Sequence, residues 1–211
     1  MKPILSFQNQ PFPQVFKMVL DFHLQEGATI LDTTPGMRYS WKKYEQNIKY
    51  NDIQFFKEKE YNISYLYTPI EKLFDLPMIF DALFFDPPYI FGTKGKTTDP
   101  REEDYGAYQH DFNKIREIFE TANTVFPSIL KPDGKLFVKY SDVFSLTDHS
   151  FYLCCSIWPN ILSNFHVIDH YIIQHHHISP TAWQVKDRPC SILNYTYLTV
   201  FKKNESERRS I

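Results

Sequence analysis

The sequence has little cysteine, no long hydrophobic run and almost no net charge. Its three cysteines are an odd number and two of them are adjacent, which argues against a disulfide framework and favours buried thiols in a reducing compartment. No apolar stretch is long enough to span a bilayer, and no signal peptide is visible. The formal net charge is −2, so a contact with nucleic acid would depend on a local basic patch. We therefore expect a soluble, cytoplasmic protein with no membrane partner.

What the sequence does contain is enough apolar and aromatic side chain for a packed core. Of its 211 residues, 43% are hydrophobic and 17% aromatic. This length predicts one domain, 1–211, and the residues at 202–211 read as a charged, frayed tail. We find no internal repeat.

Strand-like and helix-like segments alternate along the chain. Apolar runs predict strands at 28–31, 52–58, 63–67, 80–85, 135–140, 165–174 and 192–201. Helical spacing predicts helices at 16–25, 112–130 and 151–162, a helical turn at 70–74 and a further helix around Trp41 and Tyr44. We expect residues 1–13 to be irregular, Gly27 to end the first helix and 131–134 to form a turn. The order indicates an α/β fold whose sheet finishes as an antiparallel hairpin.

The strand at 80–85 ends abruptly in Asp86-Pro87-Pro88-Tyr89. Proline removes backbone donors and stiffens the chain, so the Asp86 carboxylate and the Pro87 carbonyl form a rigid pair of acceptors beside the Tyr89 ring. Such a platform suits an amino group on a planar ring. The alternative is an ordinary strand-terminating turn.

A second turn follows the predicted strand at 28–31. It contains Asp32, Thr33, Thr34, Pro35 and Gly36, and a helix is predicted after it. A strand, a glycine-containing turn and a helix form the first half of a βαβ unit, in which a ligand lies against the helix N-terminus.

Taken together, these two turns and the terminal hairpin resemble the S-adenosylmethionine-dependent amino-methyltransferases, which methylate adenine at N6 or cytosine at N4. The resemblance implies a Rossmann-like seven-stranded methyltransferase sheet, mostly parallel with a C-terminal antiparallel hairpin. It implies S-adenosyl-L-methionine as cofactor and nucleic acid as partner, with DNA ahead of RNA. The cofactor residues that it implies are Pro11, Phe12, Pro13, Asp32, Thr33, Thr34, Gly36 and Glu58, with Glu60 as an alternative to Glu58. Arg38 stands where the family has its second glycine.

The resemblance also assigns the chemistry to Asp86, Pro87, Pro88 and Tyr89. An exocyclic amino group is a poor nucleophile because its lone pair is delocalised into the ring. Two acceptors can orient that lone pair, and the carboxylate can stabilise the positive charge that develops on nitrogen. Tyr89 would stack on a base that has left its duplex.

Two polar loops, 91–111 and 175–189, would carry the substrate contacts. Lys94, Lys96, Trp183 and Arg188 are the candidates; a solvated lid and a packed tryptophan with surface cations are the alternatives. Three consecutive histidines at 175–177 cannot all reach one ion from a strand, so we expect no metal. Lys139 is interpreted as structural.

Two other functions stay open from the sequence. One is methylation of an RNA base, which uses the same chemistry. The other is a catalytically silent, nucleic-acid-binding relative of the same fold, since Arg38 adds bulk and charge to the cofactor turn. Titration of S-adenosylmethionine would separate the silent relative from an enzyme.

Overall fold

A seven-stranded sheet forms the centre of the computed structural model, which describes residues 4–34, 39–43, 48–50, 69–76, 79–87, 112–145, 150–175 and 194–204. Its spatial order is β1 (Phe7–Gln8), β8 (Phe165–Gln174), β9 (Tyr195–Lys203), β5 (Leu130–Tyr140), β4 (Phe80–Phe85), β2 (Ile30–Asp32) and β3 (Ile48–Tyr50). β9 runs antiparallel to both of its neighbours, and the other pairs are parallel. The predicted seven-stranded, mostly parallel sheet with a C-terminal antiparallel hairpin is confirmed.

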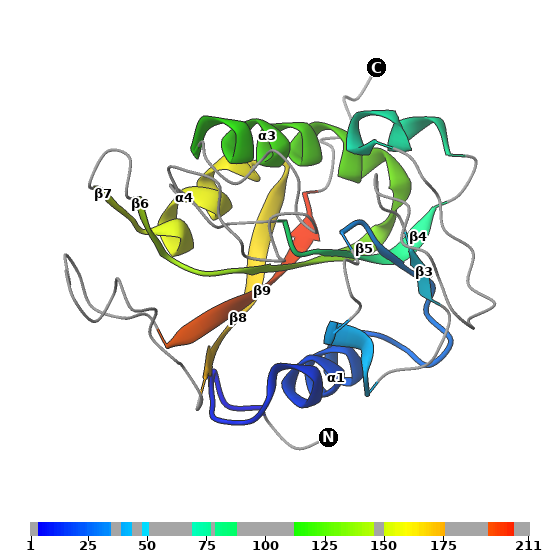
Figure 1. Cartoon of the computed structure of the whole chain (residues 1–211). Coiled ribbons are helices and arrows are strands. Elements are labelled where there is room, and N and C mark those ends of the chain that lie inside the picture. The colour runs from blue at the N-terminus through cyan, green and yellow to red at the C-terminus, as the bar shows by residue number, and fades with distance from the viewer. Residues whose placement is uncertain are drawn as a thin grey trace, which may run out of the picture.

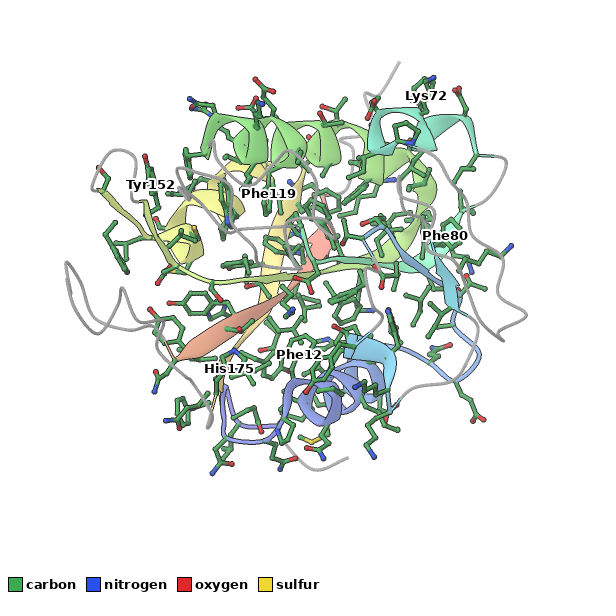
Figure 2. All side chains as sticks on the ribbon, in the orientation of Figure 1. Phe12, Lys72, Phe80, Phe119, Tyr152 and His175 are labelled. Carbon is green, nitrogen blue, oxygen red and sulfur yellow. The ribbon has the colours of Figure 1, made fainter. Side chains whose placement is uncertain are left out.

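Helices cover both faces of this sheet (Figure 1). One face carries α1 (Phe12–His23) and the 3₁₀ turn η1 (Tyr39–Trp41). The other carries α3 (Phe112–Ile129), α4 (Cys154–Ile161) and the 3₁₀ turn η2 (Ile70–Asp75). Figure 2 shows Phe12 on the α1 side of the sheet and Phe119 on the α3 side. Each face therefore has its own apolar core.

The central strand β4 supplies side chains to both cores. Phe80, Leu83 and Phe85 are fully buried on the α3 side, while Ala82 and Phe84 are buried on the α1 side. A strand buried on both faces reads as a continuous apolar run, which is why its bounds could be predicted to the residue. Because β4 is packed on both faces, its position in the sheet determines where the chain leaves the sheet at Asp86.

The first helix lies where the sequence placed it, but its predicted bounds were wrong. α1 begins at Phe12 instead of residue 16, because Pro13 is tolerated in a first turn that needs no amide donor there. It ends at His23, since Leu24 already has extended backbone angles. Gly27, with φ of 81°, turns the chain towards β2 and does not end the helix.

The short strands at the two edges of the sheet, β1 and β3, were not predicted from the sequence. β1 lies within the segment expected to be irregular, and β3 lies at a position where no strand was predicted. Two or three residues at a sheet edge carry too little apolar pattern to be recognised. The strands predicted at 52–58 and 63–67 lie outside the described residues.

The later elements differ in detail from the prediction. The turn expected at 131–134 is an irregularity inside β5, because Phe80 pairs with Leu130 and Ala82 with Lys135. A small hairpin of β6 (Val143–Ser145) and β7 (Ser150–Tyr152) was not predicted, and it takes the first residues of the helix expected at 151–162. Across the described residues, no helix combines the length and the apolar character that crossing a membrane requires.

Candidate functional site

The direction of strand addition reverses between β2 and β4. From β2 the sheet grows to β3 on one side, and to β4 and then β5 on the other. In open α/β sheets, ligands bind at the carboxyl ends of the strands at such a reversal. Asp32 ends β2 and Asp86 directly follows β4, so two acidic residues flank this point.

Asp32 is a buried acid that fixes the turn after β2. Its Oδ1 accepts a hydrogen bond of 3.0 Å from the Thr34 amide, and its Oδ2 accepts one of 2.5 Å from Nε1 of Trp41. Trp41 is itself buried edge-on against Phe16 and Phe84. The carboxylate therefore links the turn to the aromatic core on the α1 side.

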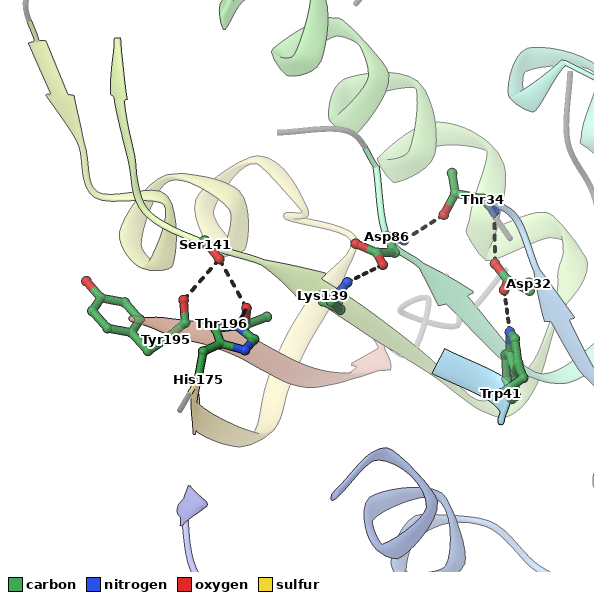
Figure 3. Close-up of polar contacts among 9 residues, drawn as sticks. All are labelled: Asp32, Thr34, Trp41, Asp86, Lys139, Ser141, His175, Tyr195 and Thr196. Atoms are coloured by element: carbon green, nitrogen blue, oxygen red, sulfur yellow. Dashed lines mark hydrogen bonds and ion pairs between the residues drawn. The ribbon is translucent and has the colours of Figure 1, made fainter. Parts of the chain in front are cut away.

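The same turn is bonded to the end of β4. The carbonyl of Phe84 accepts hydrogen bonds from the amide and the hydroxyl of Thr33, at 2.9 and 3.0 Å. The amide of Asp86 donates to Oγ1 of Thr34 at 2.6 Å. These bonds hold the two strand ends, and so the two acids, in a fixed relation; the bond between Thr34 and Asp86 is drawn in Figure 3.

Asp86 forms an ion pair with Lys139, a residue of β5. Nζ of Lys139 lies 2.5 Å from Oδ2 of Asp86, and the two side chains are 17% and 20% exposed (Figure 3). Burial raises the pKa of the Asp86 carboxyl above its ordinary value, and the Lys139 ammonium opposes that rise. From its sequence Lys139 is interpreted as structural, and this ion pair was not predicted. The signal was a lysine in the strand that lies next to β4.

Pro11, Phe12 and Pro13 were expected to contact the cofactor, and of these Phe12 lies beside the Asp86–Lys139 pair. Its buried ring lies 4.9 Å from Nζ of Lys139, measured to the ring centroid, and it stacks on Phe16. Pro11 is exposed at the N-terminus of α1, whereas Pro13 is buried in that helix. The start of α1 thus lies against the Asp86–Lys139 pair.

A group of hydroxyl and imidazole side chains lies along the same edge of the sheet (Figure 3). Oγ1 of Thr196 is 2.5 Å from Nε2 of His175 and 3.4 Å from Oγ of Ser141. Ser141 also donates to the carbonyl of Tyr195 at 3.2 Å. Within the described ranges, no three His, Cys, Asp or Glu residues are grouped as a metal ion would require.

Of the remaining predicted site residues, the structure describes Pro87. Pro87 is buried directly after Asp86. The others lie outside the described residues: Gly36, Arg38, Glu58, Glu60, Pro88, Tyr89, Lys94, Lys96, Trp183 and Arg188.

Known structures share this architecture. No protein-family model and no curated protein matches the sequence. The N-methyltransferase NodS from Bradyrhizobium japonicum is 15% identical, with a TM-score of 0.53 over 91% of this chain and 96% of its own. The 1,6-didemethyltoxoflavin-N1-methyltransferase from Burkholderia thailandensis is 12% identical, with a TM-score of 0.53 over 92% of this chain and 78% of its own. The chain has a methyltransferase fold.

TrmN from Thermus thermophilus shares the fold over part of its length. It is 11% identical with a TM-score of 0.52 over 91% of this chain, which spans about half (49%) of TrmN. In the methyltransferase fold of this chain, Asp32 and Asp86 lie on either side of the point where strand order reverses.

Proposed function

We propose that the protein is an S-adenosylmethionine-dependent methyltransferase that acts on the exocyclic amino group of adenine or cytosine in DNA. The observation that carries this proposal is Asp86, a constrained carboxylate directly after β4 and beside the turn that follows β2. Two of the similar structures are named N-methyltransferases, so the fold is compatible with methyl transfer to nitrogen.

The residues at the end of β2 fit the cofactor. Asp32 is buried there as a carboxylate already oriented by Trp41 and Thr34, and such an acid suits the ammonium group of the donor's methionine part. When bound, S-adenosylmethionine supplies an electrophilic methyl group on a sulfonium sulfur. Gly36 and Glu58 are the further cofactor residues that we propose, the latter for the ribose hydroxyls.

Asp86 would act on the amino group of the base. Its Oδ2 is held by Lys139, and Oδ1 has no hydrogen-bond partner among the described residues. An amino hydrogen donated to Oδ1, and a second to the Pro87 carbonyl, would turn the nitrogen lone pair towards the methyl group. The bound donor would supply the methyl group as the electrophile and would keep the electron pair of its carbon–sulfur bond. Asp86 stabilises the positive nitrogen until it loses a proton to solvent.

The substrate base must leave its helical stack to reach Asp86. We propose that Tyr89 stacks on the flipped base and that Lys94, Lys96, Trp183 and Arg188 contact the surrounding nucleic acid. Base stacking on one aromatic ring contributes about 1–3 kcal/mol. An aspartate at the first position of the motif suits nucleic-acid amino groups, and we propose DNA ahead of RNA.

The test is methyl transfer to unmodified DNA and RNA, followed by digestion to nucleosides and identification of the product by mass. We expect N6-methyladenine or N4-methylcytosine from DNA. Asp86→Ala should abolish the product, and Asp86→Asn, which keeps the shape but not the charge, should nearly do so. Both variants should bind S-adenosylmethionine as the unchanged protein does.

Two results would contradict the proposal in different ways. Turnover retained by Asp86→Ala would show that another group does the chemistry. No binding of S-adenosylmethionine by the unchanged protein, measured by calorimetric titration, would instead favour a silent relative of the same fold. Product in RNA alone would move the substrate class from DNA to RNA.

A further inference from the structure

Lys139 is placed beside Asp86 by the pairing of the two central strands. Phe85 of β4 pairs with Val138 of β5 in parallel register, so the residues that follow each of them are neighbours on the α1 face of the sheet. The ammonium reaches Oδ2 of Asp86 at 2.5 Å (Figure 3). The register of β4 and β5 is therefore enough to place the two side chains together.

The surroundings of Asp86 leave Lys139 as its main electrostatic partner. From α1, the apolar ring of Phe12 covers Nζ of Lys139. Asp32 is the acidic residue of β2, and its oxygens accept hydrogen bonds from Thr34 and Trp41. Among the described residues, no other cation forms an ion pair with Asp86. A partly buried carboxylate with one cation depends strongly on that cation.

We propose that Lys139 is a positioning residue, which keeps Asp86 a charged acceptor and holds its Oδ2 so that Oδ1 receives the amino group of the substrate. This inference rests on the function proposed above. Lys139 touches neither base nor methyl donor in this role, and it acts through Asp86. Without it, the carboxyl would take up a proton more readily, because burial already favours the neutral form. A neutral carboxyl stabilises a positive nitrogen poorly.

The variant to make is Lys139→Met, which keeps an unbranched side chain of nearly the same length but removes the ammonium group. We expect kcat to fall about 100-fold, the loss that a displacement of about 1 Å at a reacting group causes, with little change in KM. The acidic limb of the kcat profile should move to higher pH, since Asp86 must be deprotonated to act. Lys139→Arg should restore most of the activity and the original limb.

The chain offers a matched control on the same two strands. Lys131 pairs with Asp81 at 2.7 Å, at the opposite, amino-terminal ends of β5 and β4. Lys131→Met removes an ion pair of the same kind away from the site. We expect its kcat and acidic limb to equal those of the unchanged protein.

A second measurement does not depend on activity. The side-chain carboxyl carbon of Asp86, assigned through Asp86→Asn, can be followed by nuclear magnetic resonance as pH is changed. The carboxyl should titrate at higher pH in Lys139→Met than in the unchanged protein. In Lys131→Met it should titrate at the same pH as in the unchanged protein. A thermal melt of each variant confirms that it is folded.

The outcomes separate the two proposals. If Asp86 titrates at the same pH with and without Lys139, the positioning role is wrong whatever the enzyme does. If Lys139→Met methylates DNA with unchanged kcat and pH profile, the role is wrong although the function stands. If Asp86 shifts as expected but the unchanged protein methylates no nucleic acid, the proposed substrate fails while the control of Asp86 by Lys139 stands.

Discussion

Thr34→Val should loosen the link between the two strand ends of the site. The substitution keeps the branched shape of the side chain but removes the hydroxyl that accepts the Asp86 amide at 2.6 Å. A partly buried amide left without a partner costs about 1–2 kcal/mol. The free energy of unfolding should fall by that amount, which lowers Tm by ~2–8 °C in a domain of this size. Urea unfolding with circular dichroism measures the change.

Two controls make this expectation specific. Thr34→Ser keeps the acceptor and should stay close to the unchanged protein. Thr33→Val removes a hydroxyl donor, yet the Phe84 carbonyl still receives the Thr33 amide at 2.9 Å, so the loss should be only about 0.5 kcal/mol. Amide hydrogen exchange at Asp86 reports the bond directly. If Thr34→Val is as stable as the unchanged protein and its Asp86 amide is equally protected, the hydrogen bond does not hold the strand ends together.

Two more predictions concern stability away from the proposed chemistry. Partial desolvation acts to raise the pKa of Asp81, but hydrogen bonds from Lys131 and Thr29 outweigh it and lower the pKa to about 2. The stability this adds is present above about pH 4 and is lost as pH falls towards 2; because the pair is partly exposed we expect about 1 kcal/mol. Urea unfolding from pH 5 to pH 2 should show this loss in the unchanged protein and not in Asp81→Asn, and parallel curves would contradict it. Asp142 is buried and accepts the hydroxyls of Tyr195 and Tyr197 at 3.0 and 2.9 Å. Asp142→Ala should therefore cost about 3 kcal/mol by urea unfolding and Asp142→Asn much less, whereas equal losses would show that the acceptor does not matter.

The long buried elements were predictable because burial requires apolar residues in a continuous or periodic pattern. β4 has the predicted bounds, and α3 differs from its prediction by one residue. Each has a continuous or periodic apolar pattern that one or two cores impose. β1 and β3 were missed because they consist of two and three residues whose position depends on pairing with a neighbour.

At the site, the acids were predictable but their partners were not. Asp32 and Asp86 stand out because each ends an apolar run, and that pattern is local. Lys139 and Trp41 contact them across 53 and 9 residues of sequence, through strand register and packing that a single sequence does not display. The lysine of β5 could have been nominated only after β5 had been placed beside β4.

The two ion pairs of β4 and β5 show how position determines the chemistry of the same residue types. At the amino-terminal ends, Asp81 is 31% exposed, and its hydrogen bonds lower its pKa. At the carboxyl-terminal ends, Asp86 also has a lysine, yet burial raises its pKa. Stability alone gives no reason to bury a carboxylate whose desolvation its partner does not offset. Because that carboxylate lies at the point where the strand order reverses, a ligand with an amino group to donate would supply the missing interaction. The unfavourable burial of Asp86, together with its place at the end of β4, is therefore part of the reason that we propose the chemistry at this end of the sheet.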